Sequence, residues 1–190
     1  MVVGIASIGA EYRHQTLAAT YLATPRRASV LLGKAVSLLL FGLLYGLASV
    51  LAGLVVAVPF ILVNSGSFFF DQPETWRSLI FGVLSLALWT MIGLGIGILI
   101  KNLLFAMLVG ISFAYLIEPI LSLVFFFRKW EVPLNLMPSG ATNALLGITS
   151  PVLFAGNAPF AWWQGGLVLT AWCLLPAVIG VALVVRRDVP

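Results

Sequence analysis

Residues 35–63 read AVSLLLFGLLYGLASVLAGLVVAVPFILV and contain no charged side chain. Since about 20 consecutive apolar residues are enough for a helix to cross the hydrocarbon core of a bilayer, this run predicts a membrane-spanning helix. Small side chains recur within it at intervals of three or four residues, at Gly42, Gly46, Ser49 and Gly53. Such a stripe lets another helix approach closely, so we expect helix packing along it.

The composition of the whole chain agrees with a membrane protein. Hydrophobic residues make up 62% of the sequence and charged residues only 8%, whereas soluble domains carry about 25% charged residues. The Lys and Arg residues are scattered at the ends of apolar runs, so we expect no nucleic-acid partner despite the net charge of +4. We predict an all-α, polytopic protein that forms a single transmembrane domain over residues 1–190.

Three further apolar runs predict membrane spans at residues 78–100, 102–127 and 161–185. Residues 64–77 are polar and rich in turn-forming residues, which is typical of an exposed loop between the first two spans. Residues 128–160 are apolar but interrupted too often by Pro and Gly to cross a bilayer. We therefore expect an external segment with short helices there.

The distribution of basic residues predicts the orientation of these spans, because cytoplasmic loops are enriched in Lys and Arg. The side that is richer in Lys and Arg carries Arg13, Arg26, Arg27, Lys34, Lys101, Arg186 and Arg187. The other side carries Arg77, Arg128 and Lys129, together with Trp76, Trp130, Trp162 and Trp163, which suit an aromatic belt. The first side, with the C-terminus, is therefore predicted to be cytoplasmic.

Residues 11–34, EYRHQTLAATYLATPRRASVLLGK, are the long stretch that is both charged and amphipathic, and we call them the elbow segment. Apolar residues at roughly helical spacing predict a short amphipathic helix in its first part. Pro25 disfavours helical geometry at Thr24 and favours the start of a new helix, so we expect a bend there. Residues 1–9 are too short to cross a membrane, and we interpret them as the remnant of a preceding helix.

The sequence offers no convincing set of residues for catalysis or metal binding. It contains one histidine, His14, one cysteine, Cys173, and no phosphate-binding loop. Gly93, Gly95 and Gly97 lie within a predicted span and do not fit the dinucleotide-binding pattern, so we expect them at helix contacts. We predict that the chain is not an enzyme and holds no cofactor or metal ion of its own.

Glu118 is the only charged residue inside a predicted span. Two interpretations stay open, since an acid in a membrane is costly and marks a candidate functional site. The carboxyl group either serves the structure, next to a helix loosened by Pro119, or belongs to a translocation path or gate. Tyr115 and Ser122, about one turn to either side, are expected to share its face and to extend a polar strip.

The elbow segment resembles the coupling segment of the membrane subunits of ABC-2 type ABC transporters. That segment reads approximately E-x-R-x-G-T, followed by Leu, Pro, Arg and a Lys before a membrane helix. The matching residues are Glu11, Arg13, Thr16, Leu22, Pro25, Arg27 and Lys34. The order of the later spans, the external segment and the basic tail is also similar. The chain departs from the family pattern at Gln15, where Gly is usual, and by lacking two spans that usually precede the coupling segment.

The resemblance implies a role in ATP-driven transport across a bacterial plasma membrane. In that family the coupling helix docks on a nucleotide-binding subunit and transmits its ATP-driven closure. The implied partners are an ABC ATPase subunit, which holds ATP and Mg, a second permease subunit and the lipid bilayer. The implied coupling residues are Glu11, Arg13, His14, Thr16, Leu17, Leu22, Pro25, Arg26 and Arg27. The alternatives are a secondary transporter or channel that uses Glu118, or a membrane assembly protein that transports nothing.

Overall fold

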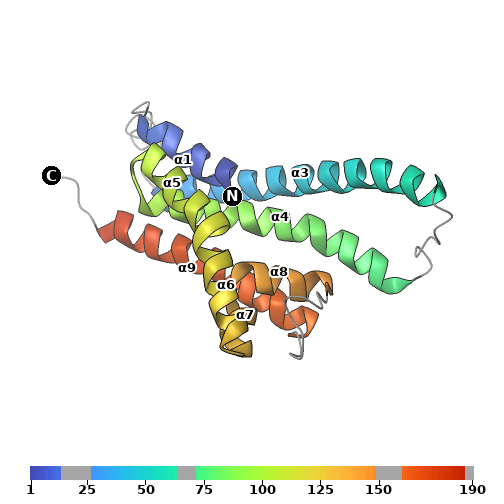
Figure 1. The fold of residues 1–190 in the computed structure, drawn as a ribbon. Helices are drawn as coiled ribbons and strands as arrows, with labels where there is room; N and C mark the ends of the chain where they lie inside the picture. The colour runs from blue at the N-terminus through green and yellow to red at the C-terminus, as the bar shows by residue number, and fades with distance from the viewer. Residues whose placement is uncertain (14–26, 64–71, 149–159, 187–190) are drawn as a thin grey trace.

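The computed structural model describes residues 1–13, 27–63, 72–148 and 160–186, and every regular element within these ranges is a helix (Figure 1). In chain order they are α1 (Val2–Arg13), α3 (Arg27–Val63), α4 (Pro73–Leu99), α5 (Leu103–Ser112), η1 (Phe113–Ile117), α6 (Glu118–Phe127), α7 (Glu131–Leu136), α8 (Pro138–Leu146) and α9 (Trp162–Arg186). The all-α prediction is confirmed for this part of the chain.

Four helical stretches are long and apolar enough to cross a membrane: Leu32–Val63, Pro73–Leu99, Leu103–Phe127 and Trp162–Gly180. The second of them starts earlier than the sequence predicts, because α4 begins at Pro73 and not at Ser78. Proline is favoured at the first helical position, and Glu74 in the first turn complements the positive end of the helix. The end of the predicted loop 64–77 is therefore helical.

α4 lies at the centre of the bundle and packs against α1, α3, α8 and α9. It contributes more buried apolar side chains to the core than any other described helix: Ala87, Leu88, Met91, Ile92, Leu94 and Ile98. Gly93 and Gly97 face α1, where an added Cβ would lie 2.0 Å from the carbonyl oxygen of Met1 and 3.2 Å from the backbone of Ile5. Gly95 faces α9 in the same way. These contacts confirm the expected helix-contact role of the three glycines.

The small-residue stripe of α3 meets α4 at only two of its four positions. A Cβ added at Gly42 would lie 2.7 Å from the Cα of Ala87, so glycine is needed for this close approach. Gly46 is also buried against α4, whereas Ser49 and Gly53 are exposed. Figure 1 shows α3 and α4 separating toward the end of α3. Packing at the two exposed positions would therefore need a neighbour other than the described part of this chain.

α1 unites residues that the sequence assigns to two segments. Residues 1–9 and the first residues of the elbow segment belong to one helix, Val2–Arg13, without a break at Glu11, whereas most of the predicted amphipathic helix lies outside the described residues. The reason is tertiary packing, since the side chains of Ile5 and Ile8 are 0% and 2% exposed. α1 lies against α4 and α5, and these contacts hold the helix together through Gly9.

The third predicted span consists of α5, η1 and α6, and η1 is a π-helical turn. Pro119 is the second residue after this turn and has no N–H to offer the carbonyl of Tyr115, with which its ring would also clash in a regular α-helix. In the wider turn, the N–H of Glu118 bonds to the carbonyl oxygen of Phe113 instead. Proline thus produces a local π-helical turn in an otherwise continuous helix.

Two short helices, α7 and α8, follow the third span, within the segment where short helices are expected. Gly147 ends α8 with a φ of 71°, a left-handed conformation that favours glycine after a helix. α8 packs against α9 so closely that a Cβ at Gly165 would lie 2.6 Å from the carbonyl oxygen of Ala141. The α7–α8 pair is therefore part of the bundle.

Candidate functional site

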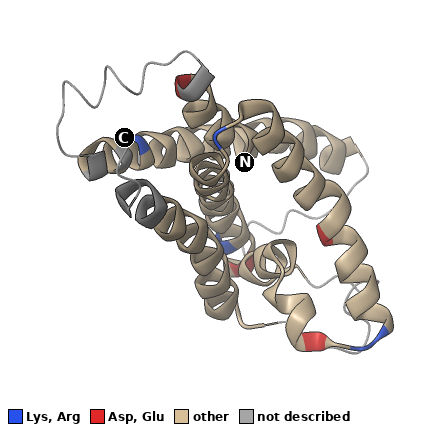
Figure 2. Ribbon diagram, turned by 90° about the vertical axis from the view of Figure 1, so that its left-hand side faces the viewer, with Lys and Arg blue, Asp and Glu red and all other residues tan. Residues whose placement is uncertain are grey.

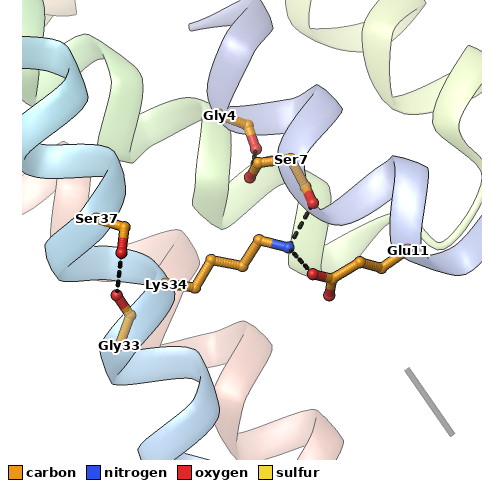
Figure 3. A network of polar contacts seen from close by, with 6 residues as sticks. All are labelled: Gly4, Ser7, Glu11, Gly33, Lys34 and Ser37. Atoms are coloured by element: carbon orange, nitrogen blue, oxygen red, sulfur yellow. Dashed lines mark hydrogen bonds and ion pairs between the residues drawn. The ribbon is translucent and has the colours of Figure 1, made fainter. Parts of the chain in front are cut away.

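The base of the elbow segment is held by an ion pair between α1 and α3. Charged residues are few along the described helices (Figure 2), and here the Nζ of Lys34 lies 2.6 Å from the Oε1 of Glu11. Lys34 also donates to the carbonyl oxygen of Ser7, so its side chain reaches from α3 to two points on α1 (Figure 3). The contact therefore joins α1, which precedes residues 14–26, to α3, which follows them.

Partial burial of this ion pair makes it stronger than a pair on the protein surface. The side chain of Lys34 is 15% exposed and that of Glu11 is 33% exposed. A fully exposed pair contributes at most about 1 kcal/mol, because water and salt screen it. We call Ser7, Glu11 and Lys34 the elbow base.

Close packing fixes the α1 side of the elbow base. A Cβ at Gly4 would lie 2.1 Å from the carbonyl oxygen of Thr90 on α4, and the side chain of Ile5 is fully buried. Gly9 faces Leu103, at the start of α5. Through α1 and Lys34, the elbow base is thus in contact with α3, α4 and α5, and it cannot shift without disturbing all three.

Most of the predicted coupling residues lie outside the described part of the chain. Those are His14, Thr16, Leu17, Leu22, Pro25 and Arg26. Arg13 is the last residue of α1 and Arg27 the first of α3, so both flank the segment. Glu11 is the predicted coupling residue whose side-chain contacts are described, and it is paired to Lys34.

Glu118 is buried, with 2% of its surface exposed, and its carboxylate faces the start of α8. Its Oε1 accepts a hydrogen bond from the backbone N–H of Ser139, the second residue of that helix. The first N–H groups of a helix have no partner within it, and Met137 in the N-cap position has no side-chain acceptor. Glu118 therefore caps α8 from a neighbouring span, in a position that the helix dipole favours for an anion.

The expected polar strip around Glu118 does not form within the described chain. Tyr115 is 79% exposed, Pro119 is exposed and Ser122 is half-buried. A π-helical turn holds more residues than an α-helical turn, so η1 rotates Tyr115 away from the face of Glu118. The expectation of a shared face is corrected for Tyr115, while a translocation path at these positions stays a prediction.

Side chains within the spans also bind α7 and α8, and the sequence predicted none of these contacts. The hydrogen bonds run from Trp89 Nε1 to Thr142 Oγ1 (3.1 Å), from Trp172 Nε1 to the carbonyl oxygen of Leu136 (2.9 Å) and from Ser78 Oγ to that of Leu146 (2.6 Å). A sequence signal exists for the two tryptophans. They lie well inside predicted spans, where a buried indole N–H needs an acceptor.

Comparison with protein-family models, with curated proteins and with solved structures gives no match. Among the described residues, no group of three or more His, Cys, Asp or Glu side chains is placed to hold a metal ion. Function is therefore inferred from the sequence and from the geometry of the elbow base and of Glu118.

Proposed function

We propose that this chain is a membrane-spanning permease subunit of an ABC-2 type ABC transporter, and that it couples ATP hydrolysis in a partner subunit to export. The observation that supports the proposal is the elbow base. Glu11 and Lys34 both belong to the residues that resemble the family's coupling segment, and they pair with each other where that segment joins the bundle.

A braced segment of this kind is suited to act as a lever. Closure of an ATPase subunit on ATP would move the polar residues between α1 and α3. Because α1 packs against α4 and α5 and is paired to α3, this movement would reach all three helices together as a shift of packed elements. A flexible connection would absorb the same movement. ATP and Mg would be held by the partner, and this chain would supply the path.

The exposed side of α3 gives a second permease subunit a surface on which to pack. Leu44 and Val55 are 67% and 73% exposed there, and the small residues Ser49 and Gly53 lie open on the same helix. We place the assembly in a bacterial plasma membrane, with the elbow segment and the C-terminus in the cytoplasm, because Lys and Arg are concentrated on that side.

Glu118 is not part of this proposal. A secondary transporter or channel would need the carboxylate to bind protons or cations, whereas its bond to Ser139 gives it a structural task. An assembly protein that transports nothing would share the elbow base but would stimulate no ATPase, and the experiment below separates it from a permease.

Reversing the charge of Lys34 should uncouple the transporter. In Lys34→Glu two acids face each other at the elbow base, and we expect stimulation of the partner's ATPase activity to fall by at least about fivefold, the lower range of typical coupling energies. The double exchange Glu11→Lys with Lys34→Glu should restore much of it. The ATPase rate is measured in proteoliposomes, with and without the permease.

The matched control is Lys129→Glu, which changes the same charge at an exposed position in the turn after α6. This variant should leave ATPase stimulation unchanged. All variants are first compared by size-exclusion chromatography. A well-folded Lys34→Glu variant that stimulates the ATPase as the unmodified chain does would remove the elbow base from the mechanism.

A further inference from the structure

A groove of about 520 Å³ lies between α4, α5, η1 and α9. Ile92 in its floor is 1% exposed, and Trp172 forms part of one wall. Its rim is made by Phe105, Leu108 and Ile117, which are 58%, 62% and 45% exposed. This volume lies within the range of about 300–1,000 Å³ that is typical of sites for small organic ligands.

The lining of the groove selects a hydrocarbon. Among the described residues that line the groove, only Ser112 carries a hydroxyl group, and the indole N–H of Trp172 is already donated to the carbonyl oxygen of Leu136. Water needs two to four polar partners, and apolar cavities stay dry. The exposed apolar rim belongs to a helix that is long enough to cross a membrane, so the groove opens onto lipid.

The length and the charge of the groove match one leaflet of a bilayer. Its lining on α5 and η1 extends over residues 105–117, or about 18 Å at a rise of about 1.5 Å per residue. Half of a hydrocarbon core of about 30 Å has a similar thickness. Exposed Lys101 lies four residues before Phe105, in the connection between α4 and α5. This cation is therefore on the side of the Phe105 end of the groove, where the headgroup of a bound lipid would lie.

We propose that this groove binds one acyl chain of an anionic phospholipid from the leaflet on the Lys101 side, with the phosphate beside Lys101. This site is independent of the proposed transport function. Trp172 both lines the groove and bonds to Leu136 at the end of α7. A bound chain would thus support η1 and the attachment of α7 at the same time.

The proposal is tested with the purified full chain in liposomes of phosphatidylcholine and phosphatidylglycerol. The probe is phosphatidylglycerol with a photoreactive diazirine in its acyl chain, and labelled residues are located by mass spectrometry. We expect residues 105–117 and 172–176 to be labelled several-fold more than Leu123 on α6 and Leu167 on α9, which are 55% and 63% exposed and do not line the groove. Unlabelled phosphatidylglycerol should compete, and phosphatidylcholine should not.

Two variants separately test the acyl-chain site and the headgroup contact. Val109→Trp fills the groove and Lys101→Gln removes the headgroup contact, and each should lower groove labelling to the level of Leu123 and Leu167. Leu104→Trp is the matched control, because Leu104 is 76% exposed on α5 and does not line the groove. Groove labelling in the Leu104→Trp variant should equal that in the unmodified chain. If Val109→Trp fails to fold, Lys101→Gln decides, since Lys101 is exposed.

Either of two results would overturn the proposal. Groove labelling equal to that of Leu123 and Leu167, and insensitive to competition, would mean that the groove meets bulk lipid only. Crosslinks from residues 105–117 to another copy of the chain would mean that a protein surface covers the groove.

Discussion

Gly4→Leu should detach α1 from α4 and leave the chain without a stable elbow base. A Cβ at this position would lie 2.1 Å from the carbonyl oxygen of Thr90 and 2.6 Å from the backbone nitrogen of Leu94. Both are backbone atoms of α4, so no change of side-chain rotamer can relieve the clash. Overpacking typically costs about 1–3 kcal/mol, and we expect a loss at or above the upper end. Heating followed by size-exclusion chromatography in detergent measures it as a lower melting temperature.

Gly53→Leu is the control for this substitution. Gly53 lies in the middle of another long helix, and nothing comes within 4 Å of its added Cβ. Since leucine has the higher helix propensity, this variant should melt at or above the temperature of the unmodified chain. Equal melting temperatures for Gly4→Leu and Gly53→Leu would show that α1 is not packed on α4 as described.

Glu118→Leu should also destabilise the chain strongly. The leucine keeps most of the apolar volume but leaves the buried N–H of Ser139 without its acceptor. Leaving a buried donor unsatisfied costs about 1–3 kcal/mol, and the favourable placement of an anion at the start of α8 is lost as well. The same melting measurement should show the loss, and α7–α8 should become more accessible to proteases.

Glu118→Gln separates the structural role of this residue from a role in transport. Glutamine keeps an acceptor oxygen for Ser139, so this variant should retain most of the stability that Glu118→Leu loses. A Gln variant that is stable but inactive in transport would place Glu118 in the translocation path. Equal melting temperatures for Glu118→Leu and Glu118→Gln would contradict the capping role.

Runs without charge were sufficient to predict the number and kind of the long helices. Their ends depend on finer signals, and Pro73 shows this, because a proline within a polar stretch suits a loop and a helix start equally well. The continuity of α1 through Gly9 was not predictable from propensity, since it depends on contacts with α4 and with Leu103, which are distant in the sequence.

The sequence identified the important charged residues one by one but not their partners. Glu11 and Lys34 belong to one motif, yet their pairing requires α1 and α3 to lie side by side. Glu118 was visible as a buried acid, and Pro119 as a helix disturbance. The cap on Ser139 and the rotation of Tyr115 follow from the fold of α7 and α8 and from η1.

α4 connects the two regions that carry these contacts. α1, with the elbow base, packs along its second half, and Trp89 bonds to Thr142 of α8 from the middle of the same helix. A displacement of the elbow base would therefore also displace α4, which contacts α8. In the proposed permease this continuity would be a physical route for coupling, and the variants of Lys34 and Glu118 test its two ends.

The most direct test of the proposed function is affinity purification of the full chain, in mild detergent, from the cells that produce it. A permease subunit should bring with it an ATPase that carries the phosphate-binding pattern G-x-x-x-x-G-K-[ST], in a constant ratio and crosslinked to residues 14–26. An intact, monodisperse chain that is recovered without any ATPase would contradict the proposal.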